Sequence, residues 1–346
     1  MNATSDTNRS LPAHAPLIAS TRGYASGGCV ECVHYGSIAV VDIDGRVLAS
    51  AGDPDALNFA RSTLKPIQAL PFVEDGGMAR FGFGSQELAV FCSSHSGESV
   101  HTAIVRSVLQ RIGARVRDLQ CGCHPPRYFA ATESATPAGL RISALHHNCS
   151  GKHSGFLAYC RMHGHRLDTY LDPEAPLQVR IRNTVQALSP DQTIVAGIDG
   201  CSAPNFALPL RRLARAYCQI ACSAVPSLRA LHFAMTRHPD LVSGTGRTDL
   251  ALMRTGAGDW VSKIGAGGLQ AIGVRSRGLG IAVRIASGDA PALHAATAEV
   301  LHQIGLLDEP ARTELAASFR PRLRNARGLA TGQLLPLFRL PRLVRS

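Results

Sequence analysis

The chain has 346 residues, of which 45% are hydrophobic and 18% are charged, and its formal net charge is +11. This composition is ordinary for a globular protein, and no apolar run reaches the roughly 18 residues that a membrane span requires. A strongly basic chain suggests nucleic acid, but the sequence has no zinc-finger spacing, RNA-binding aromatic motif or basic helix. We therefore expect neither a nucleic-acid nor a membrane partner.

The cysteines and the N-terminus indicate a cellular location. Ten cysteines are scattered along the chain, too sparsely for a disulfide framework. The N-terminal segment is polar and contains prolines, and it lacks the basic start and apolar run of a secretory signal. We expect a reducing, cytoplasmic environment, where clustered thiols indicate metal or redox chemistry more often than disulfides.

The first half of the chain predicts a hairpin, a strand and two helices. Residues 37–50 alternate between apolar and polar side chains around an Asp-Gly pair, which predicts a β-hairpin. Residues 59–73 predict a short apolar segment followed by a helix. Residues 91–99 predict the end of an apolar strand that leads through small hydroxyl residues into the next helix. The apolar stripe of that helix, which is predicted to end at Gly113, consists of Val100, Ile104, Val108 and Ile112.

The second half adds two helices and several strands. Residues 171–190 predict a helix that starts at Asp172 and Pro173. Its apolar residues at i+4 spacing are Leu177, Ile181 and Val185. Residues 193–204 predict a buried strand, and residues 261–287 predict glycine-rich strands with a hairpin near Arg277 and Gly278. An amphipathic helix is predicted over residues 287–307. Helices thus mix with antiparallel strands without regular βαβ alternation, which favours an α+β fold with helices packed on a mostly antiparallel sheet.

The segment RSTLKP contains the first candidate for catalysis. Ser62 precedes Lys65 by three residues, so on a helix their Cβ atoms would lie about 5–6 Å apart on one face. A serine nucleophile needs a base, and a lysine can be that base when its amine is neutral. Lowering its pKa from about 10.4 to about 7–8 costs roughly 4 kcal/mol, which burial and a second cation can supply. The alternative interpretation is a solvated pair on a helix surface.

Two further segments contain candidates. Ser94 is a second hydroxyl donor or nucleophile, and Ser96 is a candidate N-cap of the next helix. Lys263 lies on a predicted strand two residues before Gly265, where a glycine permits close approach of a substrate; an exposed strand lysine is the alternative. The order Ser-x-x-Lys, serine segment, Lys-x-Gly is similar to that of serine β-lactamases and penicillin-binding proteins. It suggests acyl chemistry, with Lys263 keeping the first lysine neutral.

The segment NCSGKHSG, residues 148–155, contains a thiol, an amine and an imidazole. It is not a P-loop, because that motif requires Ser or Thr directly after its lysine, where this chain has His153. Three interpretations of Cys149 are open. It is a nucleophile, an inert buried thiol, or part of a metal site together with Cys201. Zinc prefers thiolate and imidazole ligands, so chemistry alone suggests His153 or His147 as the third ligand.

Seven segments in the same order resemble the rhizobial-type L-asparaginases, also called asparaginase II. They are VECVHYGSIAVVD, RSTLKPIQALP, FCSSHSGE, LQCGCHPP, HNCSGKHSGFL, GIDGCSAPNFALPL and KIGAGGLQAIG. The resemblance implies a fold like that of the serine β-lactamases, hydrolysis of L-asparagine to L-aspartate and ammonia, and a homodimer. We expect a flexible N-terminal segment at residues 1–23, a single domain at 24–337 and a basic tail at 338–346.

The resemblance also implies a catalytic set of two serine–lysine tandems. These are Ser62 with Lys65, and Ser94 with Lys263. One serine attacks the side-chain amide, a neutral lysine takes its proton and delivers it to ammonia, and water hydrolyses the resulting aspartyl ester. The residues leave open which serine is acylated.

A zinc site and a substrate pocket are implied as well. The implied zinc ligands are Cys149, Lys152 and Cys201, with lysine in place of the histidine suggested above; metal binding can deprotonate a lysine. The predicted substrate-binding residues are Arg61, His95 and Asp199. An arginine and an aspartate suit the carboxylate and the ammonium of a free amino acid; the alternatives are a helix-start salt bridge for Arg61 and a loop cap for Asp199. The sequence leaves open whether the zinc would be catalytic or structural.

The sequence departs from the family at two positions. Gly267 replaces a common glutamate, and Ala175 replaces a common histidine, which affects substrate geometry more than reaction class. Two other functions fit part of the sequence. One is a penicillin-interacting serine hydrolase, which would be exported. The other is a non-catalytic binding protein that uses the basic tail to hold acidic partners.

Overall fold

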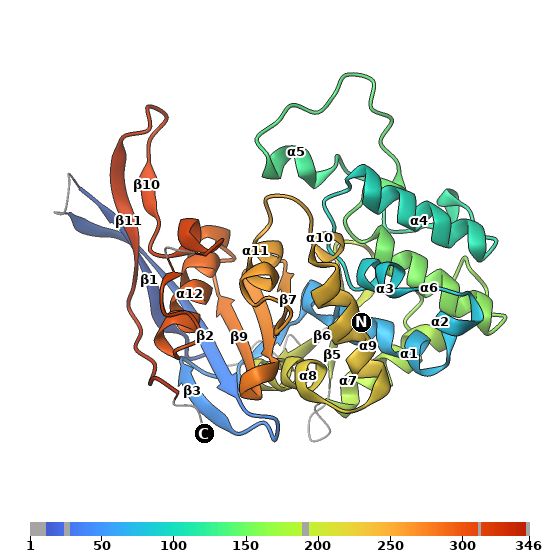
Figure 1. The fold of residues 1–346 in the computed structure, drawn as a ribbon, viewed down its shortest axis with the longest axis horizontal. Coiled ribbons are helices and arrows are strands. Elements are labelled where there is room, and N and C mark those ends of the chain that lie inside the picture. The colour runs from blue at the N-terminus through green and yellow to red at the C-terminus, as the bar shows by residue number, and fades with distance from the viewer. Residues whose placement is uncertain (1–11, 24–27, 189–193, 311–312, 344–346) are drawn as a thin grey trace, which may run out of the picture.

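The computed structural model describes residues 12–23, 28–188, 194–310 and 313–343. Its main sheet has eight strands in the order β10-β11-β1-β2-β9-β8-β7, with β3 paired to β2 (Figure 1). These strands are β1 (Ala15–Arg22), β2 (Cys29–Val41), β3 (Val47–Ala51), β7 (Trp260–Gly265), β8 (Leu269–Val274), β9 (Leu279–Ile285), β10 (Arg322–Arg324) and β11 (Ala330–Pro336). A smaller sheet has the order β4-β6-β5 and consists of β4 (Leu57–Phe59), β5 (Val195–Ile198) and β6 (Pro204–Pro209).

The helices of the described residues surround the main sheet. They are α1 (Lys65–Glu74), α2 (Gly77–Arg80), α3 (Ser85–Phe91), α4 (Ser99–Arg111), α5 (Arg127–Ala131), α6 (Ser150–Met162), α7 (Pro176–Ala187), α8 (Leu210–Cys222), α9 (Pro226–Arg237), α10 (Pro239–Val242), α11 (Thr248–Thr255) and α12 (Ala290–Gln303). Short 3₁₀ helices are η1 (Arg61–Leu64), η2 (Val116–Asp118), η3 (Ala144–His146), η4 (Arg275–Arg277) and η6 (Ala316–Ser318). None of the described helices has both the length and the apolar character that crossing a membrane requires.

The main sheet is buried on both faces. Successive side chains of a strand point to opposite faces, and β2 shows this directly. Ile38 and Val40 join the core beneath α12, whereas Ala39 and Val41 join the larger core beneath α8. In Figure 1, α12 lies in the left half of the picture among strands β1, β2 and β9, and most of the other helices lie on the right. The result is three layers, with the sheet in the middle.

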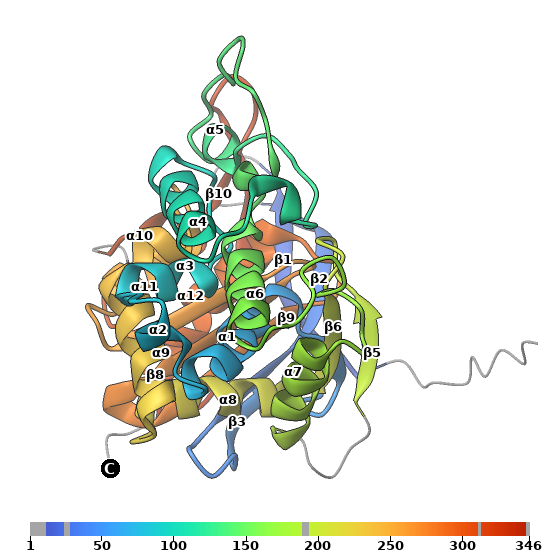
Figure 2. The same ribbon diagram turned by 90° about the vertical axis from the view of Figure 1, so that its right-hand side faces the viewer.

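The helical side of the molecule positions the segments with candidate chemistry. Helix α1 packs against α6 and α7, as Figure 2 shows from the helical side. The η1 turn that precedes α1 packs against β7 at the end of the main sheet. The Ser-x-x-Lys segment therefore lies where the helical layer meets the strand that carries Lys263.

The predicted α+β class is confirmed, because every strand pairing in the described residues is antiparallel and helices cover both faces. The hairpin predicted at residues 37–50 is formed by β2 and β3. The hairpin predicted near Gly278 joins β8 to β9, and Gly278 has the left-handed φ of 59° that favours glycine.

Several local predictions are wrong. Phe91 ends the helix α3 and not a strand, because a short apolar run does not distinguish the two. Strand β5 lies at the edge of the small sheet, and its Ile198 is 83% exposed. Helix α7 begins at Pro176, because Asp172 forms a turn with Ala175 before it. The buried residues of α4 are His101, Val105, Val108 and Leu109, so Val100 is not in the stripe.

The two ends of the described chain differ from the expected boundaries. Residues 15–22 were expected in a flexible segment but form β1, which pairs with both β2 and β11. Phe338 and Leu340, expected in a basic tail, are buried in the core beneath α12. These contacts join segments far apart in sequence, so a local pattern does not predict them. Residues 1–11 and 344–346 lie outside the described residues.

Close packing of α8 on β9 gives a test of the layers. A Cβ atom at Gly280 would lie 1.9 Å from Ala214 O, so we expect Gly280→Ala to lower the free energy of unfolding by about 3 kcal/mol. Gly84→Ala is the control, because the nearest atom to its Cβ would be 3.5 Å away, and we expect a loss below about 1 kcal/mol. Urea unfolding measures both, and equal losses would contradict this packing.

Candidate active site

All three lysines of the chain are buried in one region. The chain has 33 arginines but three lysines, and Lys65, Lys152 and Lys263 are 1%, 3% and 0% exposed. The charges of Lys152 and Lys65 lower the pKa values of Lys65 and Lys263, respectively, which places the amines near one another. Arginine does not lose its proton in proteins, so a lysine is required wherever a neutral amine must act. The three lysines therefore mark the candidate site.

A strained turn holds Ser62 just before α1. Arg61 has a φ of 51°, which is rare for a residue other than glycine, and such strain concentrates at functional sites. The Arg61 N–H donates to Asn205 Oδ1 at 3.0 Å. On the other side, a Cβ atom at Gly265 of β7 would lie 3.0 Å from Ala60 O. Strands β6 and β7 thus fix the backbone that carries Ser62.

Lys65 is bonded to the loop that carries Ser94. Its Nζ donates to Ser93 O at 2.5 Å and to Asn148 O at 3.3 Å, and it lies 3.0 Å from Ser94 Oγ. Burial lowers the pKa of Lys65 and the charge of Lys152 adds to this, although two nearby thiols oppose the shift. Lys65 is therefore a buried amine in direct contact with a serine hydroxyl.

Lys263 is bonded to a carboxylate. Its Nζ lies 3.3 Å from Asp249 Oδ2 and donates to Ile264 O at 2.8 Å. Burial lowers the pKa of Lys263 to about 8, although the charge of Asp249 opposes the shift. Lys263 thus titrates close to neutral pH, beside a fixed anion.

The structure joins the four predicted catalytic residues differently from the implied tandems. Among the described residues, Lys65 is hydrogen-bonded to Ser94 and not to Ser62, and Lys263 is bonded to Asp249 and not to Ser94. Ser62 lies in η1, whereas Lys65 is the first residue of α1, so the two are not on one regular helix. The four residues still come from segments that meet, because η1 packs against β7 and Lys65 reaches the Ser94 loop.

Two of the predicted substrate-binding residues form an ion pair. Arg61 Nε donates to Asp199 Oδ1 at 2.6 Å. Burial raises the pKa of Asp199, but the charges of Lys152 and Arg61 outweigh this and hold the pKa below its usual value. The pair lies at the strained turn before Ser62, so its charges are available at one end of the site.

The third predicted substrate-binding residue, His95, has both ring nitrogens engaged within the protein. Its Nδ1 accepts from the Gly97 N–H at 3.1 Å, and its Nε2 lies 2.9 Å from Ser150 Oγ. Ser150 Oγ donates to Leu145 O, so it accepts a hydrogen bond from His95 Nε2–H. Burial, together with the nearby cation of Lys65 and neighbouring histidines, holds the pKa of His95 well below its usual value. In this structure, His95 connects the Ser94 loop to α6. Ser96, the expected N-cap, instead donates to Ser243 O.

Cys149, Lys152 and Cys201 form a buried cluster. Lys152 Nζ donates to Cys201 Sγ at 3.2 Å. A hydrogen bond with Cys201 and the charges of nearby lysines lower the pKa of Cys149 well below its usual value, although burial opposes the shift. Cys149 and Lys152 come from the start of α6, and Cys201 comes from the turn after β5, where Ser202 has a strained φ of 69°.

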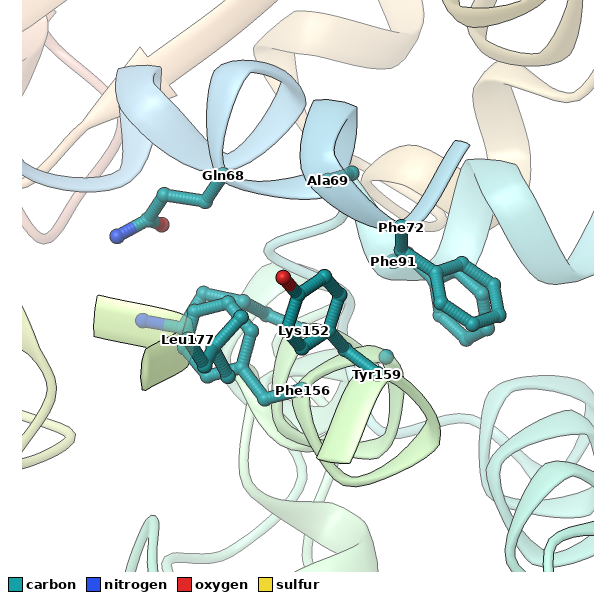
Figure 3. Close-up of a pocket in the computed structure, with 9 residues that line it drawn as sticks. Gln68, Ala69, Phe72, Phe91, Lys152, Phe156, Tyr159 and Leu177 are labelled. Atoms are coloured by element: carbon teal, nitrogen blue, oxygen red, sulfur yellow. The ribbon is translucent and has the colours of Figure 1, made fainter. Parts of the chain in front are cut away.

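Apolar side chains enclose the stem of Lys152. Its Nζ lies 5.3 Å from the centre of the Phe156 ring. Figure 3 shows the lysine stem beside Phe156, with its amine toward the same side as the amide of Gln68. The apolar wall therefore leaves the amine to make its polar contact with the Cys201 thiol.

The two histidines suggested as metal ligands have other contacts. His147 Nδ1 accepts from the Cys149 N–H at 3.0 Å, and His153 Nδ1 lies 2.7 Å from Tyr170 Oη. Within the part of the chain that the structure describes, no oxygen or nitrogen atom is hydrogen-bonded to His153 Nε2, although the Cys201 thiol is near enough to affect its pKa. In the described part of the chain, no group of three or more histidine, cysteine, aspartate or glutamate side chains could hold a metal ion. Lys152 is a nitrogen donor in direct contact with the Cys201 thiol.

In a comparison with known protein families, the profile of the L-asparaginase II family matches residues 21–336. The chain belongs to the L-asparaginase II family. It is therefore an amidohydrolase that acts on L-asparagine. A search of curated proteins found no match.

Gly267 and Ala175, the two positions at which this asparaginase II chain departs from the family, are not among the predicted catalytic or zinc-binding residues. Gly267 lies in the turn between β7 and β8 with a φ of 76°, a conformation that favours glycine. Ala175 is the residue before the first turn of α7. Two polar residues of the site, Asn205 and Asp249, were not predicted from the sequence. The lysine count is the signal that was available, because each buried lysine requires polar partners.

The shortage of lysines makes a direct pKa measurement possible. Labelling lysine with carbon-13 at Cε would give three signals, and Lys263→Met would assign one of them. We expect the Lys263 signal to titrate near pH 8, charged below and neutral above, whereas a solvated lysine titrates near about 10.4. NMR spectra over a pH series measure this, and a midpoint at the solvated value would contradict control by burial.

Proposed function

We propose that this amidohydrolase forms a serine ester with the side-chain acyl group of L-asparagine and uses Lys65 as the base. The observation that carries the proposal is the 3.0 Å contact between Lys65 Nζ and Ser94 Oγ in a buried site. A serine hydroxyl requires a neighbouring base, and a positioned proton acceptor contributes roughly 10²–10⁴ in rate.

A neutral Lys65 satisfies its three oxygen contacts. A neutral amine has two N–H groups and one lone pair. The carbonyl oxygens of Ser93 and Asn148 accept the two N–H groups, so the lone pair is left for the hydroxyl of Ser94. Burial disfavours the charged form of an amine, which supports this assignment.

Two routes share this base. In one, Ser94 Oγ attacks the amide carbon and gives its proton directly to Lys65. In the other, Ser62 Oγ attacks, and the Ser94 hydroxyl passes the proton on, since a hydroxyl both donates and accepts. In both routes the proton goes from Lys65 to the leaving nitrogen, and ammonia departs. Water then attacks the aspartyl ester, gives its proton to Lys65, and the serine oxygen recovers a proton as L-aspartate leaves.

The ion pair beside Ser62 suits the other end of the substrate. Arg61 and Asp199 already present opposite charges 2.6 Å apart. The α-carboxylate of asparagine can replace Asp199 as the partner of Arg61, and its α-ammonium can pair with Asp199. Binding both charged groups would fix the side-chain amide relative to the serines, which supplies orientation.

The arrangement of the lysines supports a fold like that of the serine β-lactamases. The Ser-x-x-Lys segment lies at the start of α1 and packs against β7, which carries Lys-x-Gly at the end of an antiparallel sheet. We also propose a single domain in a cytoplasmic homodimer; these predictions rest on the resemblance and, for the location, on the scattered cysteines.

Cys149, Lys152 and Cys201 would hold a zinc ion. Two thiols and an amine that already lie together match the sulfur and nitrogen donors that zinc prefers. A bound zinc ion would neutralise the thiolates and order the start of α6 against the turn after β5. The serine, Lys65 and the ion pair perform the steps above, so the metal is assigned to order and substrate positioning.

Serine variants distinguish the two routes. If Ser94 is acylated, Ser62→Ala still accumulates an aspartyl ester and Ser94→Ala does not; if Ser62 is acylated, the pattern is reversed. We expect each variant to lose roughly 10²-fold or more in turnover. Acid quenching followed by peptide mass spectrometry locates the ester, and ammonia release measures turnover. Full turnover in both variants would contradict the proposal.

Metal analysis tests the zinc site separately. We expect about one zinc per chain, reduced to near zero in Cys149→Ser and Cys201→Ser, because each removes a thiolate ligand. Cys160→Ser is the matched control, since Cys160 is another buried cysteine of α6 but lies outside the cluster. Elemental analysis of purified protein gives the ratio, and zinc retained by the first two variants would remove those thiols from the site.

A further inference from the structure

We infer that Asp249 is a positioning residue for the reaction: it fixes the Lys263 amine and ties it to the loop that carries Ser94. The inference rests on the proposed function, because it assumes that Lys263 acts in turnover. No sequence motif singles out Asp249. Its role follows from four contacts, from its burial and from the segment to which it belongs.

The carboxylate of Asp249 is fully enclosed by donors. Oδ2 lies 3.3 Å from Lys263 Nζ and accepts from the Ile264 N–H at 2.8 Å. Oδ1 accepts from Ser262 Oγ and from Gln270 Nε2, both at 2.9 Å. Three of these donors come from β7 and one from β8, so the carboxylate joins α11 to two strands.

Both members of the ion pair are inaccessible to solvent. The side chains of Asp249 and Lys263 are each 0% exposed. Burial raises the pKa of Asp249, but Lys263 and the other donors outweigh this, so the group stays an anion. An anion held by four donors cannot turn away, and it therefore fixes the direction of the Lys263 amine.

The segment before Asp249 is bonded to the Ser94 loop. The Ser94 N–H donates to Val242 O at 2.9 Å, and Ser96 Oγ donates to Ser243 O at 3.1 Å. One short stretch, residues 242–249, thus contacts the predicted nucleophile at one end and Lys263 at the other. A change at Asp249 would alter the position of Lys263 relative to Ser94.

The other charged and titratable groups near Lys263 do not duplicate this role. Lys65 on α1, whenever it is protonated, and Arg247 before α11 disfavour a charged Lys263. The Cys92 thiol at the end of α3 has a pKa raised to about 12 by burial, so it stays neutral. Tyr217 on α8 faces the Asp249 side, and burial raises its pKa well above the usual value. Asp249 is therefore the anion that holds this amine.

The test compares Asp249→Asn with two other variants in the full-length chain. Asp249→Asn removes the charge at nearly constant shape, and Asp249→Glu keeps the charge on a longer side chain. Glu299→Gln is the matched control, because Glu299 is a buried carboxylate of α12 that is bonded to Arg320. The readouts are the Lys263 signal of carbon-13 lysine over a pH series, and kcat and KM for ammonia release from L-asparagine across the same range.

We expect Asp249→Asn to lower the Lys263 titration midpoint by about one unit or more. We expect kcat to fall roughly tenfold to a hundredfold with little change in KM, and the acid limb of the pH profile to move to lower pH. Asp249→Glu should keep the Lys263 midpoint near that of the unmodified chain and restore part of kcat. Glu299→Gln should change neither readout, even if it unfolds at lower temperature.

The outcomes separate this inference from the proposed function. An unchanged Lys263 midpoint in Asp249→Asn overturns the inference whatever the rates are. If that variant does not fold, Asp249→Glu decides: a reduced kcat supports the inference, because the longer side chain keeps the charge but displaces the amine, and an unchanged kcat overturns it. Full turnover by Lys263→Met overturns instead the premise that Lys263 acts in turnover.

Discussion

Three amines are buried at one site where few carboxylates accompany them, and the rest of the structure follows from this constraint. An isolated charged amine is costly to bury. Lys263 has one carboxylate, Lys65 has two carbonyl oxygens and a hydroxyl, and Lys152 has a thiol. Each set of partners suits a different protonation state. A neutral base, an amine near its titration point and a potential metal ligand can therefore exist within one site.

The scaffold supplies these partners from elements that are distant in sequence. The main sheet presents Lys263 on β7, and Gly265 lets the η1 turn approach the same strand. Two residues of the site have a strained backbone. Arg61 precedes the candidate nucleophile Ser62, and Ser202 follows Cys201. Strain of this kind persists where the surrounding structure holds it. Here the small sheet provides that support, through the contact of Asn205 with Arg61.

The sequence predicted the parts that depend on local pattern. It placed the β2–β3 hairpin, and it placed Lys263 on a strand two residues before Gly265. The family resemblance added Lys152 beside Cys201, which the structure brings within 3.2 Å. Contacts between distant segments were not predictable from spacing. Lys65 binds Ser94 because two loops meet, His95 turns its ring toward Ser150, and Asp249 lies in a segment without any motif. The strand β1 was missed for the same reason, since its partners β2 and β11 are needed to stabilise it.

Turnover of L-asparagine by Lys65→Arg tests the central claim most directly. Arginine keeps a long side chain with donors for Ser93 O and Asn148 O, but it cannot accept a proton from serine. If Lys65 acts as a neutral base, the folded variant should lose roughly 10²–10⁴ of kcat, with its thermal unfolding showing that the site is intact. Turnover equal to that of the unmodified chain would contradict the account, because a permanent cation would then serve as well as a neutral amine.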